Sequence, residues 1–134
     1  MIKKLIVVLG WMMLSWTSAA GDLYTGRYAT CMDQSGGVTS YMLDCIGEEL
    51  HLQDAWLNSV YRELRDELSP ERRQALLTAQ RLWIQYRDAK CNFESDPRGE
   101  GGTLAHVITN MCILSETAER ADELRGVLNL LNHP

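Results

Sequence analysis

The sequence predicts an all-α fold: a small bundle of three long helices and a short N-terminal helix, braced by two disulfides. Apolar residues recur at helical spacing along three long segments, and β-branched residues are sparse. A Ser-Pro pair and a glycine-rich stretch separate those segments, and the four cysteines are an even number. A chain of 134 residues has room for one core and hardly for two domains.

Residues 1–20 have the pattern of a secretory signal peptide. Lys3 and Lys4 precede an apolar run, and small residues end the segment at Ala20. The apolar run, residues 5–16, is shorter than the roughly 20 residues that a membrane-spanning helix needs. We therefore expect cleavage after Ala20, a periplasmic or secreted location, and no membrane anchor once the signal is removed.

The chain expected after cleavage, residues 21–134, is a single acidic domain. Without Lys3 and Lys4 it holds 11 basic and 18 acidic residues, which is a net charge of −7. Nucleic-acid binders normally carry a basic surface, so this balance argues against a nucleic-acid partner. Hydrophobic residues make up 46% of the full chain, which argues against disorder.

The first helices follow from the spacing of apolar residues. A short helix is expected around Tyr28–Asp33, before the glycines at 36 and 37. Residues 39–68 contain no proline, and their apolar residues form a helical stripe rather than the alternation of a strand. The stripe consists of Leu43, Ile46, Leu50, Leu57, Val60, Tyr61, Leu64 and Leu68.

Ser69 and Pro70 end this helix and start the next one. Serine is a good N-cap and proline is favoured at the first helical position, so the second long helix should begin at Pro70 and end near residue 94. The tight turn makes the two helices antiparallel neighbours. Residues 95–102 form a loop on composition, and Thr103 is expected to cap the last long helix.

The four cysteines allow three disulfide pairings. Export places them in an oxidising compartment, where they should pair. An antiparallel helix pair would bring Cys91 close to Cys112, and a folded-back N-terminus would bring Cys31 to Cys45, so we favour these two bridges. Zinc ligation is the alternative, but it usually shows closely spaced Cys or His pairs, which the sequence lacks.

Polar residues that share helix sides with core positions predict an internal network. A charged or amide side chain that faces a core must find hydrogen-bond partners. We therefore expect Arg87 to meet an acid, with Asp54 as the candidate. The network residues are Asp54, Asn58, Tyr61, Gln80, Trp83, Arg87, Asp88, Thr117 and Arg120.

The sequence contains no recognisable catalytic or cofactor-binding motif. It has no nucleophile elbow, no phosphate-binding loop and no histidine pair at metal-ligand spacing. An acid/base pair could be drawn from the carboxyl groups of Asp54, Asp88 and Glu119. The sequence does not fix the distances between these carboxyl groups. We expect no enzymatic activity, no metal site and no cofactor.

Residues 79–91 form the most distinctive block of the chain, AQRLWIQYRDAKC. Other notable positions outside the block are Cys31, Cys45, Asn58, Tyr61, Gly101, Gly102, Thr103, Cys112, Thr117, Arg120, Glu123 and Leu124. Together these residues resemble the LprI-like family of exported lysozyme-inhibitor domains, over about residues 28–128. The resemblance implies a small helical, disulfide-bonded envelope protein, although this chain lacks the cysteine to which the family's namesake attaches lipid.

The resemblance also implies a protein partner, and a basic host lysozyme is the partner it suggests. An acidic domain would be steered toward such a target by charge. The best candidate for blocking the substrate cleft is the 96–102 loop, which offers Arg98 to the catalytic carboxylates, flanked by Asp96 and Glu100. The second candidate surface is the acidic patch of Asp44, Glu48 and Glu49.

The sequence leaves two other functions possible besides lysozyme inhibition. The first is a non-catalytic envelope module that binds another protein. The second is a hydrolase, which ranks last because no motif supports it. A lysozyme activity assay separates the inhibitor from the binding module, and a screen for substrate turnover tests the hydrolase.

Overall fold

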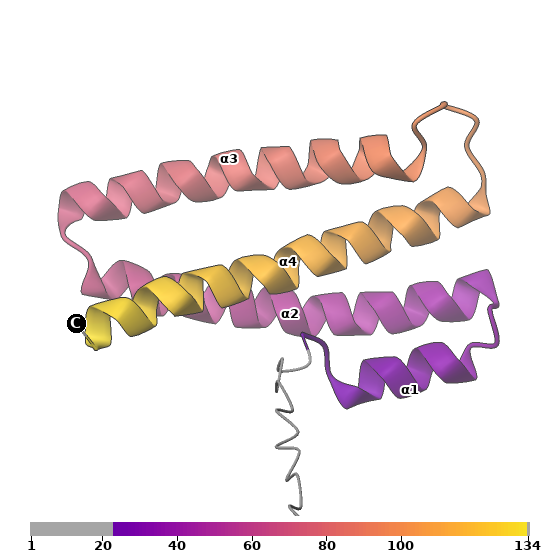
Figure 1. The fold of residues 1–134 in the computed structure, drawn as a ribbon, viewed down its shortest axis with the longest axis horizontal. Helices are drawn as coiled ribbons and strands as arrows, with labels where there is room; N and C mark the ends of the chain where they lie inside the picture. Colours follow the sequence, from indigo (N-terminus) through magenta and orange to yellow (C-terminus); the bar gives the residue numbers. More distant parts are fainter. Residues whose placement is uncertain (1–22, 134) are drawn as a thin grey trace, which may run out of the picture.

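A computed structural model describes residues 23–133 as four helices joined by short turns and one loop. They are α1 (Gly26–Gln34), α2 (Thr39–Glu67), α3 (Pro70–Ser95) and α4 (Thr103–Asn132) (Figure 1). No strand occurs in residues 23–133, so the predicted all-α class is confirmed. The predicted signal peptide, residues 1–20, lies outside the described residues. None of the helices in the described part combines the length and apolarity needed to cross a membrane.

Local sequence signals explain where α1 and α3 begin. Thr25 caps α1, and its hydroxyl accepts a hydrogen bond from the backbone N–H of Tyr28 at 3.2 Å. Ser69 caps α3 with Pro70 at the first turn, as predicted. The prediction that Thr103 caps α4 is wrong, because Thr103 is already helical and Gly102 holds the cap position with a φ of 122°.

The core lies mainly between α2 and α4, which pack along their length. One apolar cluster consists of Leu57, Val60, Leu64, Ala121, Leu124 and Leu128. The second lies nearer the start of both helices, where Ile46, Val107 and Leu114 meet. Burying a leucine or isoleucine side chain contributes about 1.5–3 kcal/mol. The α2–α4 pair therefore supplies most of the apolar stabilisation.

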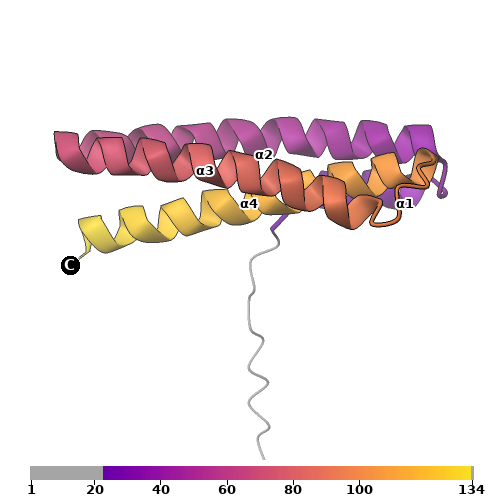
Figure 2. The same ribbon diagram turned by 90° about the horizontal axis from the view of Figure 1, so that it is seen from above.

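Helix α3 packs mainly on α4, although a tight turn joins α2 to α3. Figure 2 shows α3 starting at the end of α2 and crossing toward α4. The expectation that the first two long helices are packed neighbours is therefore wrong. Cys91 is the one residue of α3 that is fully buried, so α3 lacks the apolar contacts that would hold it against α2. Helix α4 contacts both of them, and α1 packs on α2.

Both predicted disulfides are present. Cys31–Cys45 joins α1 to α2 with Cα atoms 5.7 Å apart, and Cys91–Cys112 joins α3 to α4 with Cα atoms 5.5 Å apart. No cysteine of the chain is free, which excludes the zinc alternative. Each bridge fastens a helix that buries little apolar surface to the α2–α4 pair.

Replacing Cys91 and Cys112 together with alanine should lower the free energy of unfolding by about 3 kcal/mol. The bridge closes a loop in the unfolded chain and so lowers the conformational entropy of the unfolded state. Alanine keeps the site apolar, which suits the fully buried Cys91. Urea denaturation followed by circular dichroism measures the change. The Cys31 and Cys45 double replacement is the control and should cost slightly less, since its loop is shorter. A loss below about 1 kcal/mol for the first pair contradicts the expectation.

Candidate functional site

Trp83 lies at the centre of a polar network between α3 and α4. The Arg87 guanidinium lies 5.0 Å from the ring centroid, and the Arg120 guanidinium lies 5.8 Å from it. The Nε of Arg120 donates a hydrogen bond to the Oε1 of Gln80 at 3.1 Å. Arg120 reaches from α4 to the indole ring and to Gln80 on α3, so these two contacts tie α3 to α4.

Arg87 joins this network, and its acidic partner is Asp88 where the sequence predicted Asp54. Its guanidinium binds the carboxylate of Asp88, with 2.8 Å between NH2 and Oδ1, and its NH1 donates to the hydroxyl of Thr117. Thr117 is fully buried and donates in turn to the carbonyl of Ile113. The prediction that Asp54 is the partner of Arg87 is wrong, because Asp88 follows Arg87 in the chain and needs no second helix to reach it.

Asp54, Asn58 and Tyr61 do not join this network. Asp54 and Asn58 are exposed on α2, where the Asn58 amide donates to both the carbonyl and the carboxylate of Asp54. Tyr61 packs against the apolar cluster of α2 and α4. The nine residues that the sequence grouped together therefore divide into an α3–α4 network, an exposed pair on α2, and one core aromatic residue.

A shallow concavity of about 380 Å³ lies where α3 diverges from α2. It is lined by Gly47, Leu50, His51, Asp54, Arg87 and Ile113. Asp54 and Arg87 thus face the same space without forming an ion pair, since Arg87 is engaged by Asp88. In residues 23–133 no three His, Cys, Asp or Glu side chains gather closely enough to hold a metal ion.

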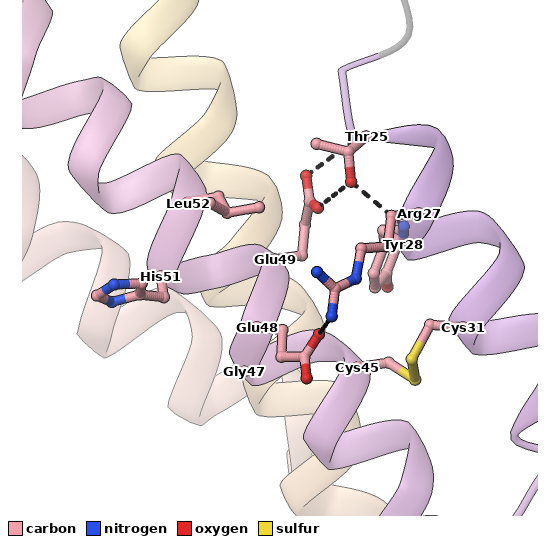
Figure 3. A pocket seen from close by; sticks show the side chains of 10 residues that line it. All are labelled: Thr25, Arg27, Tyr28, Cys31, Cys45, Gly47, Glu48, Glu49, His51 and Leu52. Carbon is pink, nitrogen blue, oxygen red and sulfur yellow. Dashed lines mark hydrogen bonds and ion pairs between the residues drawn. A yellow bond between two sulfur atoms is a disulfide. The ribbon is translucent and has the colours of Figure 1, made fainter.

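A second pocket, of about 430 Å³, lies between α1 and α2 (Figure 3). Glu49 is 2% exposed at its wall, and its carboxylate accepts hydrogen bonds from the backbone N–H and the hydroxyl of Thr25. The amide of Gln53 donates a third hydrogen bond at 2.8 Å. Glu49 therefore holds the start of α1 on α2.

Opposing effects set the ionisation of Glu49. Burial raises the pKa of its carboxyl group, but the hydrogen bonds from Thr25 and Gln53 outweigh burial and leave the pKa below its ordinary value. Burial beside Tyr24 and Glu49 raises the pKa of Tyr28 in the same pocket. The ionised form of Glu49 is thus the one that fixes α1.

The acidic patch proposed from sequence is smaller than expected. Glu49 is buried, and Glu48 forms an ion pair with Arg27 at 2.9 Å, as Figure 3 shows. Asp44 remains exposed. The sequence could not reveal this, because Thr25 and Glu49 lie 24 residues apart and no local motif connects them.

Sequence reasoning also missed an ion pair between α3 and α4. Lys90 binds Glu116 across the two helices and lies 3.8 Å from Glu94 on its own helix. The hydrogen bond to Glu116 raises the pKa of Lys90. This pair lies close to the Cys91–Cys112 bridge, so the end of the α3–α4 hairpin is fastened both by charge and by a covalent bond.

The α3–α4 loop is held in shape by Asp96. Its carboxylate accepts hydrogen bonds from the backbone N–H groups of Glu100 at 3.0 Å and Gly101 at 2.8 Å. Gly99 and Gly101 have φ values of 71° and 69°, which other residues adopt at a cost. Of the three predicted contact residues, Arg98 and Glu100 are exposed, and Asp96 supports the loop from inside.

Acidification should release α1 from α2 through Glu49. Because its folded pKa lies below the unfolded value of 4.5, its contribution is complete above that value and is lost as the pH falls through the folded pKa. Glu49→Gln should therefore raise amide hydrogen exchange in α1 about tenfold at pH 7 and reduce its sensitivity to acid. Glu48→Gln is the control, since Glu48 pairs at the surface. Equal effects of both variants would contradict this role.

Trp83→Leu should lower the free energy of unfolding by about 1–3 kcal/mol, because the ring loses two guanidinium partners and its contact with the α2–α4 core. Trp56→Leu is the matched control. Its ring meets one guanidinium, that of Arg125, and is 49% exposed, so its loss should stay below about 1 kcal/mol. Urea denaturation measures both, and an equal loss would mean that Trp83 is no more important than a surface tryptophan.

Comparison with protein-family models matches residues 31–124 to the family described as "Lysozyme inhibitor LprI". The match spans well over half of the chain and includes all four cysteines, the Trp83 network and the α3–α4 loop. No curated protein and no solved structure matches the chain. The chain belongs to the LprI family of lysozyme inhibitors.

Proposed function

We propose that this protein binds basic lysozymes outside the cytoplasm and blocks their substrate cleft. The observation that carries the proposal is the family match over residues 31–124. Two disulfides fit an oxidising compartment, where such an encounter takes place. The partner is a protein, and this chain acts by occupying a surface, without a catalytic step of its own.

The charge of the chain favours a basic partner. The net charge is −5 for the full sequence, and α2 carries seven acidic and two basic residues. Most of these acids are exposed, including Asp44, Asp54 and Glu63. Opposite charges speed the association of two proteins and make it sensitive to salt.

The α3–α4 loop is the part best shaped to enter a cleft. Retaining glycosidases such as lysozyme hold two carboxyl groups about 5–5.5 Å apart, and an arginine fork can bind carboxylates through two hydrogen bonds. Arg98 is exposed at the loop, between residues that turn the chain sharply. We assign Arg98 to those carboxylates and Asp96 to positioning the loop.

The loop is also rigid enough to bind without a large entropic cost. The Asp96 carboxylate fixes two backbone N–H groups, and the Cys91–Cys112 bridge and the Lys90–Glu116 ion pair hold the helices on either side. A loop held in its bound shape loses less conformational freedom when it docks. This arrangement supports the loop over the acidic patch as the blocking element.

Arg98→Ala should raise the inhibition constant for a basic animal-type lysozyme at least about tenfold, because the arginine contact is lost from the centre of the interface. Arg62→Ala is the matched control. Arg62 is an exposed arginine near the C-terminal end of α2, and that end of α2 lies at the opposite end of the bundle from the α3–α4 loop (Figure 1). Its loss should leave inhibition unchanged. Lysozyme activity on bacterial cell walls and calorimetric binding measure both variants.

Inhibition by the wild-type chain should also weaken strongly as salt rises from about 0.05 to about 0.5 M, because screening shortens the reach of the α2 charges. Wild-type chain that neither binds nor inhibits a panel of basic lysozymes at low salt would overturn the proposed function. Inhibition that survives Arg98→Ala would keep the function but reject the loop as its site.

A further inference from the structure

Helix α3 carries an apolar stripe along one flank, beside the face that packs on α4. The stripe consists of Ala75, Ala79, Leu82, Tyr86, Ala89 and Phe93. All six side chains are exposed, and the three large ones are 60%, 59% and 69% accessible in chain order. Cys91, Arg87 and Gln80 contact α4 from another side of the helix. Because the six stripe residues stay exposed, no helix of the described chain covers them.

The spacing of the stripe is that of a helix-pairing seam. Its members alternate steps of four and three residues, which is the pattern that keeps one face of a helix against a partner helix. Cys91 is the one fully buried residue of α3, so the other apolar side chains of this helix stay at least partly exposed. A continuous exposed apolar surface of this kind marks an interaction site.

We propose that this stripe is the interface of a homodimer in which α3 of two copies pair antiparallel. We place Leu82 of one copy opposite Tyr86 of the other. The two-fold axis then places Ala79 of each copy opposite Ala89 of the other. It likewise places Ala75 of each copy opposite Phe93 of the other. Each Phe93 ring then meets a small residue, and the alanines let the helices approach closely. A parallel pair would instead place each Phe93 ring against its counterpart in the other copy.

Charge selects the same arrangement. One further step along the stripe toward its start leads to Arg72, whereas Asp96 lies beyond the end of α3 and its carboxylate is engaged in the loop. In the antiparallel register the two Arg72 side chains lie at opposite ends of the seam and stay far apart. A parallel pair would place Arg72 against Arg72, which is unfavourable.

The charge of α3 favours a second copy over lysozyme as the occupant. Helix α3 carries five basic and three acidic residues, whereas α2 carries seven acidic and two basic residues. A basic protein is repelled from α3 and drawn to α2. Two copies of this acidic chain repel each other through their carboxylates. That repulsion is weaker at α3 than at α2, because α3 carries fewer acidic residues.

The size of the seam sets the expected affinity. A helix of 26 residues is about 39 Å long, and a stable interface buries at least about 1,200 Å² over both partners. The exposed parts of Tyr86 and Phe93 add roughly 100–150 Å² for each ring. The four rings of a dimer thus supply about 400–600 Å², and the rest of the seam must supply the remainder, so we expect a small interface with a dissociation constant in the micromolar range.

Sedimentation equilibrium of the disulfide-bonded chain, from about 1 to about 200 µM, should show a monomer–dimer equilibrium. Ala89→Glu should make the chain monomeric over this range, because it places a carboxylate within the seam. Ala55→Glu is the matched control, since Ala55 is an exposed alanine on α2 and its replacement should leave dimerisation unchanged. A wild-type monomer at the highest concentration, or a dimer unaffected by Ala89→Glu, overturns the proposal.

Cross-linking tests the direction of the helices. Ala79→Cys mixed with Ala89→Cys should form an intermolecular disulfide, since these positions face each other. Either variant alone should not, because the like positions lie ten residues apart along the seam, about 15 Å, beyond disulfide reach. Peptide mapping confirms that the native bridges are intact. Cross-linking of either variant with itself overturns the antiparallel register.

This proposal does not depend on lysozyme binding, and the two can fail separately. Ala89→Glu should dissociate the dimer while the inhibition constant stays within about twofold of the wild-type value. If wild type is monomeric and Ala89→Glu weakens inhibition, the stripe contacts lysozyme and the homodimer is rejected. If the chain dimerises but inhibits no lysozyme, the proposed function fails and the interface stands.

Discussion

The packing of α4 against α2 is the constraint on which the rest of this bundle depends. Both apolar clusters lie between these two helices, and the small residues Ala118 and Ala121 are fully buried on α4. Small side chains let the helix axes approach, so the larger leucines and Ile46 fill the space on either side. Helices α1 and α3 are then positioned by contact with one member of this pair.

Those two peripheral helices are held by polar and covalent contacts more than by apolar burial. Helix α1 has no fully buried residue and is held by Glu49 and the Cys31–Cys45 bridge. Helix α3 is held by Trp83 between two arginines, by Lys90 and Glu116, and by the second bridge. Because both apolar clusters lie between α2 and α4, the other two helices need polar and covalent contacts to hold their positions.

The same division gives the molecule separate surfaces with different chemistry. Helix α2 presents acids, the α3–α4 loop presents Arg98 on a framework set by Asp96, and the outer face of α3 presents apolar side chains. The acidic surface and the loop suit a basic enzyme with an acidic cleft, and the apolar stripe suits a copy of itself. The proposed inhibitory contact and the proposed self-association contact therefore use different residues of this chain.

The sequence alone determined the helices and the family, because helical periodicity, the Ser69-Pro70 cap and the block at 79–91 are local signals. It favoured the two bridges among three possible pairings, and the fold confirmed them. Tertiary structure decided which side chains meet. Arg87 takes the adjacent Asp88 in place of the distant Asp54, and Glu49 turns inward to Thr25 across 24 residues. It also decided that α3 leaves α2 to pack on α4. Periodicity tells which face of a helix is apolar, but only the packed fold decides which neighbour that face meets.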